Sequence, residues 1–307
     1  MQDLRDVAAL REHSRHVVRE LGFLRPTYGS TGCTHSQAHA LVELDREGAL
    51  TGAELAERLR QDPSTASRTI AQLLARGWAR PTSQSSDRRR KPLVLTARGR
   101  RQLARVDAAA NAQVSRALAL LSPPERKAVL SGMHAYAAAL ARARQREGLV
   151  VRRIRSVDDA AMGRIIRQVM TEFGAVGSGY AIVDPEVSRM SAAYRGPRSA
   201  YFVIVRDGQV LGGGGIGPLR GGPPDTCELR KMYFLPQLRG LGMGREMLDR
   251  CLIEAKRIGY RRCYLETLER MATARALYES VGFRKLDAPM GDTGHHRCDA
   301  WYVKDLD

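Results

Sequence analysis

The sequence predicts two domains, a mainly helical one over residues 1–147 and an α/β one over residues 148–307. A chain of 307 residues is about twice the length of a common single domain. Helical periodicity fills most of the first half, whereas strand-like and helical runs alternate after residue 148. Charge is also uneven, because residues 1–147 hold 25 Lys and Arg against 14 Asp and Glu. This excess of basic residues favours a polyanionic partner for the first half.

Capping residues define the helices expected in the first half. Thr34 and Thr51 are typical N-cap residues, and Asp62 followed by Pro63 is a typical helix start. Two short strand-like runs flank a polar, basic loop, which predicts a hairpin. The expected helices cover residues 4–24, 34–46, 53–59, 62–76, 97–120 and 123–146, and the expected strands cover residues 78–81 and 92–96.

The second half is expected to form a sheet with helices between its strands. Asp207-Gly208 separates two strand-like runs and is a strong hairpin-turn signal. The expected strands cover residues 149–154, 200–206, 209–217, 226–234 and 262–267, with a last one around 301–303. The expected helices cover residues 157–173, 185–194, 243–258 and 271–280.

Composition excludes several classes of protein. No apolar stretch is long enough to span a bilayer, and the first residues lack the apolar core of a secretory signal, so we expect a cytoplasmic protein without a membrane partner. The five cysteines are scattered without a C-x-x-C pair, which predicts free, mostly buried thiols. The run from His295 to Asp299 lacks a matching ligand cluster, so we interpret it as a solvated loop and expect no metal.

Two short helices, a tight turn and a basic hairpin form the plan of a winged helix-turn-helix. In that plan the second helix lies in the major groove of DNA. Four consecutive cations, Arg88 to Lys91, would repel one another at the hairpin tip unless an anion receives them. The expected DNA contacts on the second helix are Ser64, Thr65, Ser67 and Arg68.

The segment DRRRKPLVLTARG, residues 87–99, resembles the wing signature of the MarR family. In that family the wing Asp braces an Arg that enters the minor groove, which implies Asp87 with Arg89 or Arg88, beside Arg90. The resemblance covers residues 1–147. It implies binding to double-stranded DNA and a homodimer formed by the first and last two helices. The alternative is a MarR-like fold kept only for dimerisation.

A glycine-rich turn follows the strand expected at 226–234. Gly240, Gly242 and Gly244 alternate at a strand-to-helix junction, where backbone N–H groups and the helix N-terminus can bind an anion. Arg239 adds a positive charge suited to a diphosphate. The spacing is not G-x-G-x-x-G, and no Gly-Lys-Ser/Thr follows, so neither common nucleotide-binding loop matches.

The pattern Arg239-x-x-Gly242-x-Gly244 resembles the coenzyme-binding motif of GCN5-related N-acetyltransferases (GNAT). The later segment ALYESVGF, residues 276–283, is similar to a second signature of that family. Together they cover residues 150–307 and imply an α/β GNAT fold with a mixed, mostly antiparallel sheet. The implied donor is acetyl-CoA, and its implied binding residues are Met232, Phe234, Arg239, Gly240, Leu241, Gly242, Met243 and Gly244.

The same resemblance implies catalytic residues. Tyr278 would be the general acid toward the leaving thiolate, and Glu228 the general base for the amine, with Glu266 in reserve. Met271 stands where the family often has Asn, which puts one side-chain contact to the coenzyme in doubt. The acceptor site is expected among the early helices of the domain, at Glu172, Phe173, Tyr180, Asp184 and Tyr194, with Glu266.

These features predict an acetyl-CoA-dependent N-acetyltransferase that acts on a primary amine of a small molecule and is joined to a DNA-binding transcriptional regulator. No cysteine lies beside an evident base, so direct transfer is expected rather than an acyl-enzyme. The alternative is a transcription factor whose second domain senses acetyl-CoA or a metabolite with little turnover.

Overall fold

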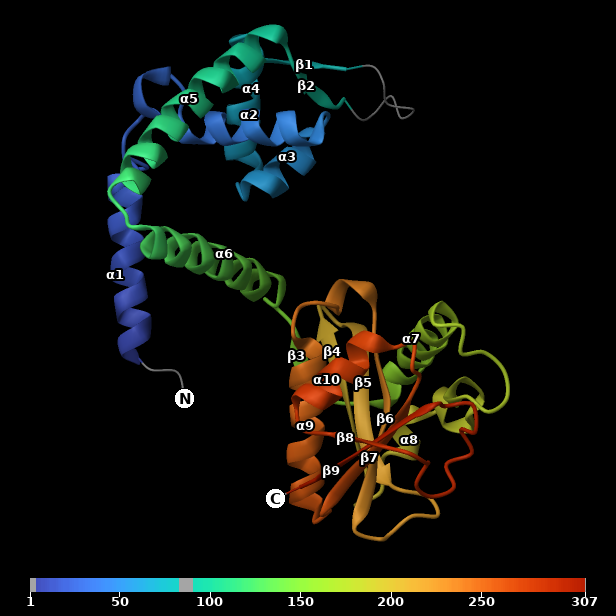
Figure 1. Ribbon diagram of the computed structural model, residues 1–307. Coiled ribbons are helices and arrows are strands. Elements are labelled where there is room, and N and C mark those ends of the chain that lie inside the picture. The colour runs from blue at the N-terminus through green and yellow to red at the C-terminus, as the bar shows by residue number, and fades with distance from the viewer. Residues whose placement is uncertain (1–3, 83–90, 307) are drawn as a thin grey trace. The chain divides into compact units, whose positions relative to one another are not determined.

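The computed structural model describes residues 4–82 and 91–306. The chain divides into two compact units, Met1–Met133 and His134–Asp307 (Figure 1). A mainly helical first unit and an α/β second unit with a mixed sheet confirm the predicted fold class.

The first unit contains most of the helices expected for a winged helix-turn-helix. Thr34 and Thr51 each form a capping box, and the Asp62 carboxylate accepts hydrogen bonds from the backbone of Ser64 and Thr65, so the three predicted helix starts are confirmed. Its elements are α1 Leu4–Glu20, α2 His35–Glu47, α3 Gly52–Leu59, α4 Pro63–Ala75, β1 Ala79–Pro81, β2 Leu93–Leu95, α5 Ala97–Ala119 and the start of α6 Pro123–Gln145.

A compact apolar core holds α2 to α5 and the hairpin together. Leu41, Leu55 and Leu73 are fully buried there, and Trp78 and Leu95 pack against them. β1 pairs with β2 in antiparallel register from Ala79–Leu95 to Pro81–Leu93. In contrast, neither α1 nor α6 has a buried residue.

The second unit is a seven-stranded sheet in the order β3-β4-β5-β6-β7-β9-β8. All neighbouring strands are antiparallel except β6 and β7, which are parallel. Its strands are β3 Val150–Arg153, β4 Ala200–Arg206, β5 Gln209–Pro218, β6 Thr226–Phe234, β7 Arg262–Thr267, β8 Arg284–Leu286 and β9 Ala300–Asp305. Its helices are α7 Asp159–Glu172, α8 Met190–Ala193, α9 Met243–Ile258 and α10 Ala272–Ser280.

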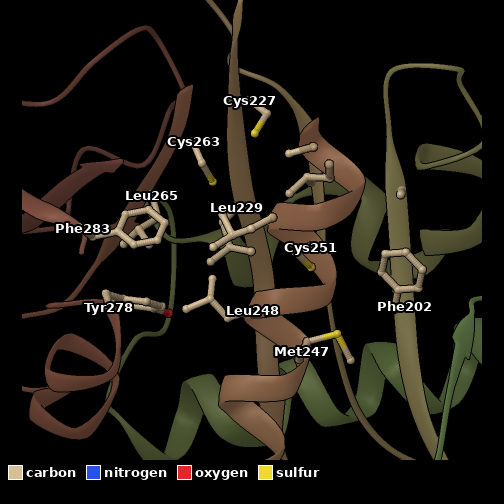
Figure 2. Close-up of a cluster of buried hydrophobic side chains, with 14 of the residues drawn as sticks. Phe202, Cys227, Leu229, Met247, Leu248, Cys251, Cys263, Leu265, Tyr278 and Phe283 are labelled. Carbon is tan, nitrogen blue, oxygen red and sulfur yellow. The ribbon is translucent and has the colours of Figure 1, made fainter. Parts of the chain in front are cut away.

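Helices α7 and α9 pack on opposite faces of this sheet (Figure 1). Alternate residues of β4 separate the two cores, because Phe202 and Ile204 pack with α9 whereas Tyr201 and Val203 pack with α7. Figure 2 shows the α9 side, where Cys227 and Cys263 of the strands face Cys251 of the helix. All five cysteines are free and four are buried, as predicted.

Two sequence expectations for the second unit were wrong. The helix expected over residues 185–194 is a 3-10 turn, Pro185–Ser188, followed by the short α8, because Arg189 leaves helical backbone geometry. The short strand β8 was missed, since it lies at the sheet edge and has only three residues. Among the described residues, no helix is long and apolar enough to cross a membrane.

Candidate functional site

Strands β6 and β7 separate halfway along their length and open a cleft. They pair only from Thr226–Arg262 to Glu228–Tyr264. A bulge in β6, where Lys231 has a φ of 54°, helps to turn the strand away. The cleft beyond has a volume of about 650 Å³ and is lined by residues of β6, β7, α7 and α10. Because no described strand pairs with this side of β6 past Glu228, its backbone can bind an extended ligand.

The glycine-rich turn forms one end of the cleft. Gly240 and Gly242 have φ angles of 73° and 78°, and Gly242 is the N-cap of α9 without a side-chain cap. Leu241 and Met243 alternate with them and bury their side chains in the core. This alternation fixes the turn and leaves the first N–H groups of α9 without intrahelical partners, so they can bind an anion.

The side chain of Arg239 does not point freely into solvent. Its guanidinium forms a bidentate ion pair with Glu172, the last residue of α7, and lies over the ring of Phe173. Glu172 and Phe173 were expected in the acceptor site, and the structure instead has both beside the glycine-rich turn. The expected coenzyme residues Met232, Phe234, Arg239, Gly240, Gly242 and Gly244 all line the cleft.

Tyr278 lies on α10 and lines the cleft. Its ring packs against Phe283 and Tyr302, and Figure 2 shows its hydroxyl directed toward Leu248 of α9. Burial raises the pKa of Tyr278, so the hydroxyl is protonated at neutral pH. No described residue accepts a hydrogen bond from it, which leaves the proton available to a ligand.

Glu228 is a buried carboxylate at the deep part of the cleft. Only 4% of the residue is exposed, and burial raises its pKa to about 7. Arg230 Nε approaches the carboxylate at 3.6 Å, and the Glu228 side chain forms no hydrogen bond to any described residue. Glu266, in contrast, accepts hydrogen bonds from Tyr264 and Thr293. Glu228 is therefore the carboxylate that is free to accept a proton near neutral pH.

His295 links two other acidic residues beside Glu228. Its Nε2 lies 2.9 Å from Asp184 Oδ2, and its Nδ1 lies 3.6 Å from Glu266 Oε2. Burial lowers the pKa of His295, but the hydrogen bonds to Asp184 and Glu266 raise it to about 9 overall. The imidazole is therefore charged at neutral pH. Lys231 also pairs with Asp184 through a side chain that is only 2% exposed.

The expectation of a solvated loop holds for His296, Arg297 and Asp299, which are exposed, but not for His295, which is half-buried and lines the cleft. No local pattern could have revealed this, since its partners are more than 25 residues away in the sequence. Tyr180 lines the cleft as expected, whereas Tyr194 packs below it against Tyr201. Within residues 4–82 and 91–306, no group of three or more His, Cys, Asp or Glu could hold a metal ion.

The expected DNA-binding residues of the first unit lie at the start of α4. Ser64, Ser67 and Arg68 are exposed, and Thr65 is half-buried. Arg68 donates a hydrogen bond to Thr65 Oγ1 at 3.1 Å, which orients the guanidinium along the helix. The expected wing residues Asp87, Arg88, Arg89 and Arg90 lie outside the described residues.

Comparisons with known proteins match both units. The model of the acetyltransferase (GNAT) family matches residues 170–283, and that of the MarR family matches residues 31–90. The uncharacterised N-acetyltransferase YjgM of Escherichia coli K12 is 42% identical over 158 residues, which are 51% of this chain and 95% of that protein.

Two further matches concern the second half of the chain. The uncharacterised N-acetyltransferase C1271.07c of Schizosaccharomyces pombe is 30% identical over 130 residues, 42% of this chain and 76% of that protein. Among solved structures, a GNAT-family acetyltransferase of Staphylococcus aureus Mu50 is 18% identical, with 52% of this chain and 99% of that chain covered and a TM-score of 0.46.

Proposed function

Because the chain belongs to the GNAT family of N-acetyltransferases, we propose that it transfers the acetyl group of acetyl-CoA to a primary amine on a small, cationic molecule. The observation that carries this proposal is Glu228, a buried carboxylate with a pKa of about 7 in the cleft that also holds the glycine-rich turn and Tyr278. A base with a pKa near the working pH is suited to deprotonate an ammonium group.

Different residues of the cleft carry out different steps of the reaction. Acetyl-CoA supplies the activated thioester. Glu228 accepts a proton from the attacking amine, directly or through water, as the new C–N bond forms. Backbone N–H groups of β6 at Met232 or Phe234 stabilise the negative charge on the acetyl oxygen. The Tyr278 hydroxyl donates its proton to the sulfur as the C–S bond breaks.

The charge around Glu228 supports a cationic acceptor. Asp184, Glu186 and Glu266 surround it, against Lys231 and His295. Arg230 lies between Glu228 and Glu186. When Glu228 is ionised, four carboxylates thus face three cations, and this surplus negative charge favours an ammonium group. The volume of the cleft is shared with the donor, so it suits a small molecule better than a protein segment.

For the MarR-family unit we propose binding to double-stranded DNA as a homodimer with a regulatory role. The exposed start of α4 supports DNA contacts. Leu4, Leu120, Leu130 and Met133 are each more than half exposed on or beside α1 and α6, which have no buried residue. Long helices rarely remain stable with an apolar face in water, so a second copy is the expected partner.

An acceptor screen tests the enzymatic proposal. Purified protein is mixed with acetyl-CoA and a panel of small primary amines, and release of the coenzyme thiol is followed with a colour reagent. We expect turnover with cationic amines and none with neutral or acidic ones. Tight binding of acetyl-CoA with no turnover across the panel would instead favour a sensor domain that has lost its activity.

A further inference from the structure

The C-terminal turns of α6 lie against the glycine-rich turn. From His134 onward, α6 belongs to the same compact unit as the acetyltransferase fold. Arg146, just after the helix, pairs with Glu246 in the first turn of α9. Arg206 of β4 donates a hydrogen bond to the carbonyl of Gln145. This ion pair and this hydrogen bond, each made by a guanidinium group, therefore hold this end of α6 beside the turn.

Two arginines of this segment lie at or beside the end of the cleft. Arg142 is one of its lining residues. A Cβ atom on Gly242 would lie 3.8 Å from Nη1 of Arg146, so this guanidinium is next to the turn itself. The two residues are four positions apart and share a face of the helix, whereas Arg144 between them points elsewhere.

Arg142 differs from the other arginines around the glycine-rich turn in its ion pairing. Arg239 pairs with Glu172, Arg245 with Asp249 and Arg146 with Glu246. No described carboxylate pairs with Arg142. A favourable interaction with the C-terminal dipole of α6 would account for basic residues here, but it would apply equally to Arg144. It does not explain why Arg142 and Arg146 lie at the anion-binding end of the cleft.

We propose that Arg142 and Arg146, which precede the acetyltransferase fold in the sequence, bind the phosphate groups of coenzyme A. The first N–H groups of α9 and these two guanidinium groups would then hold the anion from two sides. This inference rests on acetyl-CoA as the donor and is independent of the acceptor proposed above.

Calorimetric titration of the full-length protein with coenzyme A tests it, using the variants Arg142→Ala, Arg146→Ala and the matched control Arg144→Ala. Loss of one charge-assisted phosphate contact should weaken binding about tenfold for Arg142→Ala. Arg146→Ala should weaken binding by at least the same factor, because it removes a phosphate contact and also leaves Glu246 unpaired near the phosphates. Arg144→Ala should bind as the unchanged protein does.

Two further probes identify the phosphates and control for misfolding. Acetylpantetheine has no phosphate, so its affinity should be the same in all variants. If the loss disappears with 3′-dephospho-coenzyme A, the contact is to the 3′-phosphate, and if it persists, the contact is to the diphosphate. Equal affinities of Arg142→Ala, Arg146→Ala and Arg144→Ala for coenzyme A would overturn the inference, as would an equal loss with acetylpantetheine. If no amine in the screen were acetylated but coenzyme A still bound, only the proposal about the acceptor would be contradicted.

Discussion

The two ends of the cleft are built from different parts of the chain. At the proposed donor end the groups available for binding are backbone atoms, namely the amides at the start of α9, the turn through Gly240 and Gly242, and the open edge of β6. At the proposed acceptor end they are side chains from separate segments, such as Glu228, Glu266 and His295. The fold itself therefore determines the donor end, whereas individual side chains determine the acceptor end.

The largest effect should come from the acceptor end, at Glu228. Glu228→Gln keeps the shape of the side chain but removes the base, so turnover should fall by about a hundredfold or more. In the unchanged protein the rate should rise as the pH passes through about 7, because the carboxylate must be deprotonated and burial sets its pKa there. The variant should lose this rise, as measured by kcat/KM against pH.

Glu266→Gln is the matched control for this substitution. Its carboxylate accepts hydrogen bonds from Tyr264 and Thr293, and we expect a much smaller loss. If Glu266→Gln abolished turnover and Glu228→Gln did not, Glu266 would be the base and the assignment of roles would reverse.

The next largest effect is expected where the two ends meet, at Tyr278. Tyr278→Phe removes the proton donor but keeps the ring packed against Phe283 and Tyr302. Turnover should fall about a hundredfold, which is the lower end of the typical range for a lost general acid. The Kd for acetyl-CoA, measured by titration, should stay the same. A parallel loss of affinity would mean that Tyr278 only supports the donor site.

A change in backbone geometry should affect the donor end selectively. Gly242 has a φ of 78°, which a β-branched residue adopts at a cost of about 1–2 kcal/mol. Gly242→Val should therefore raise the Kd for acetyl-CoA about tenfold, while turnover at saturating donor changes little. Gly259→Val is matched to it, since Gly259 has a φ of 99° at the other end of α9 with open space around it. An equal effect of both variants on Kd would indicate general destabilisation of the helix.

The difference between the two ends also explains what the sequence could predict. The donor motif is contiguous, because one strand, one turn and one helix start create it, and all of its expected residues except the buried Leu241 and Met243 line the cleft. The helix caps of the first unit were predictable for the same reason, since Thr34, Thr51 and Asp62 act on neighbouring residues. Local patterns predicted these features because the interactions that create them are local.

The acceptor end could be predicted only in part. Glu228 and Glu266 follow from their strands, but Glu172, which was expected here, lies at the glycine-rich turn through an ion pair with Arg239, 67 positions away. The contact between His295 and Asp184 spans 111 positions. Such residues come together only when the chain folds, so neither their spacing nor the composition of the sequence predicts these contacts. The position of Arg142 in the cleft was missed for this reason too, because it belongs to a helix of the other predicted domain.

The smallest effect is expected at His295, and it tests whether the acceptor end acts as one charged network. The charged imidazole favours the ionised form of Glu228, as do Arg230 and Lys231, whereas Glu266 opposes it. His295→Gln removes the cation and leaves Asp184 and Glu266 less compensated, so the pKa of Glu228 should rise. The acid limb of kcat/KM should move to higher pH by about half a unit, which is about a twofold loss at pH 7. The exposed neighbour His296 supplies the control, since His296→Gln should leave the profile unchanged. A uniform loss of rate at every pH, without a shift of the limb, would show that His295 only supports the loop and that the charges act separately.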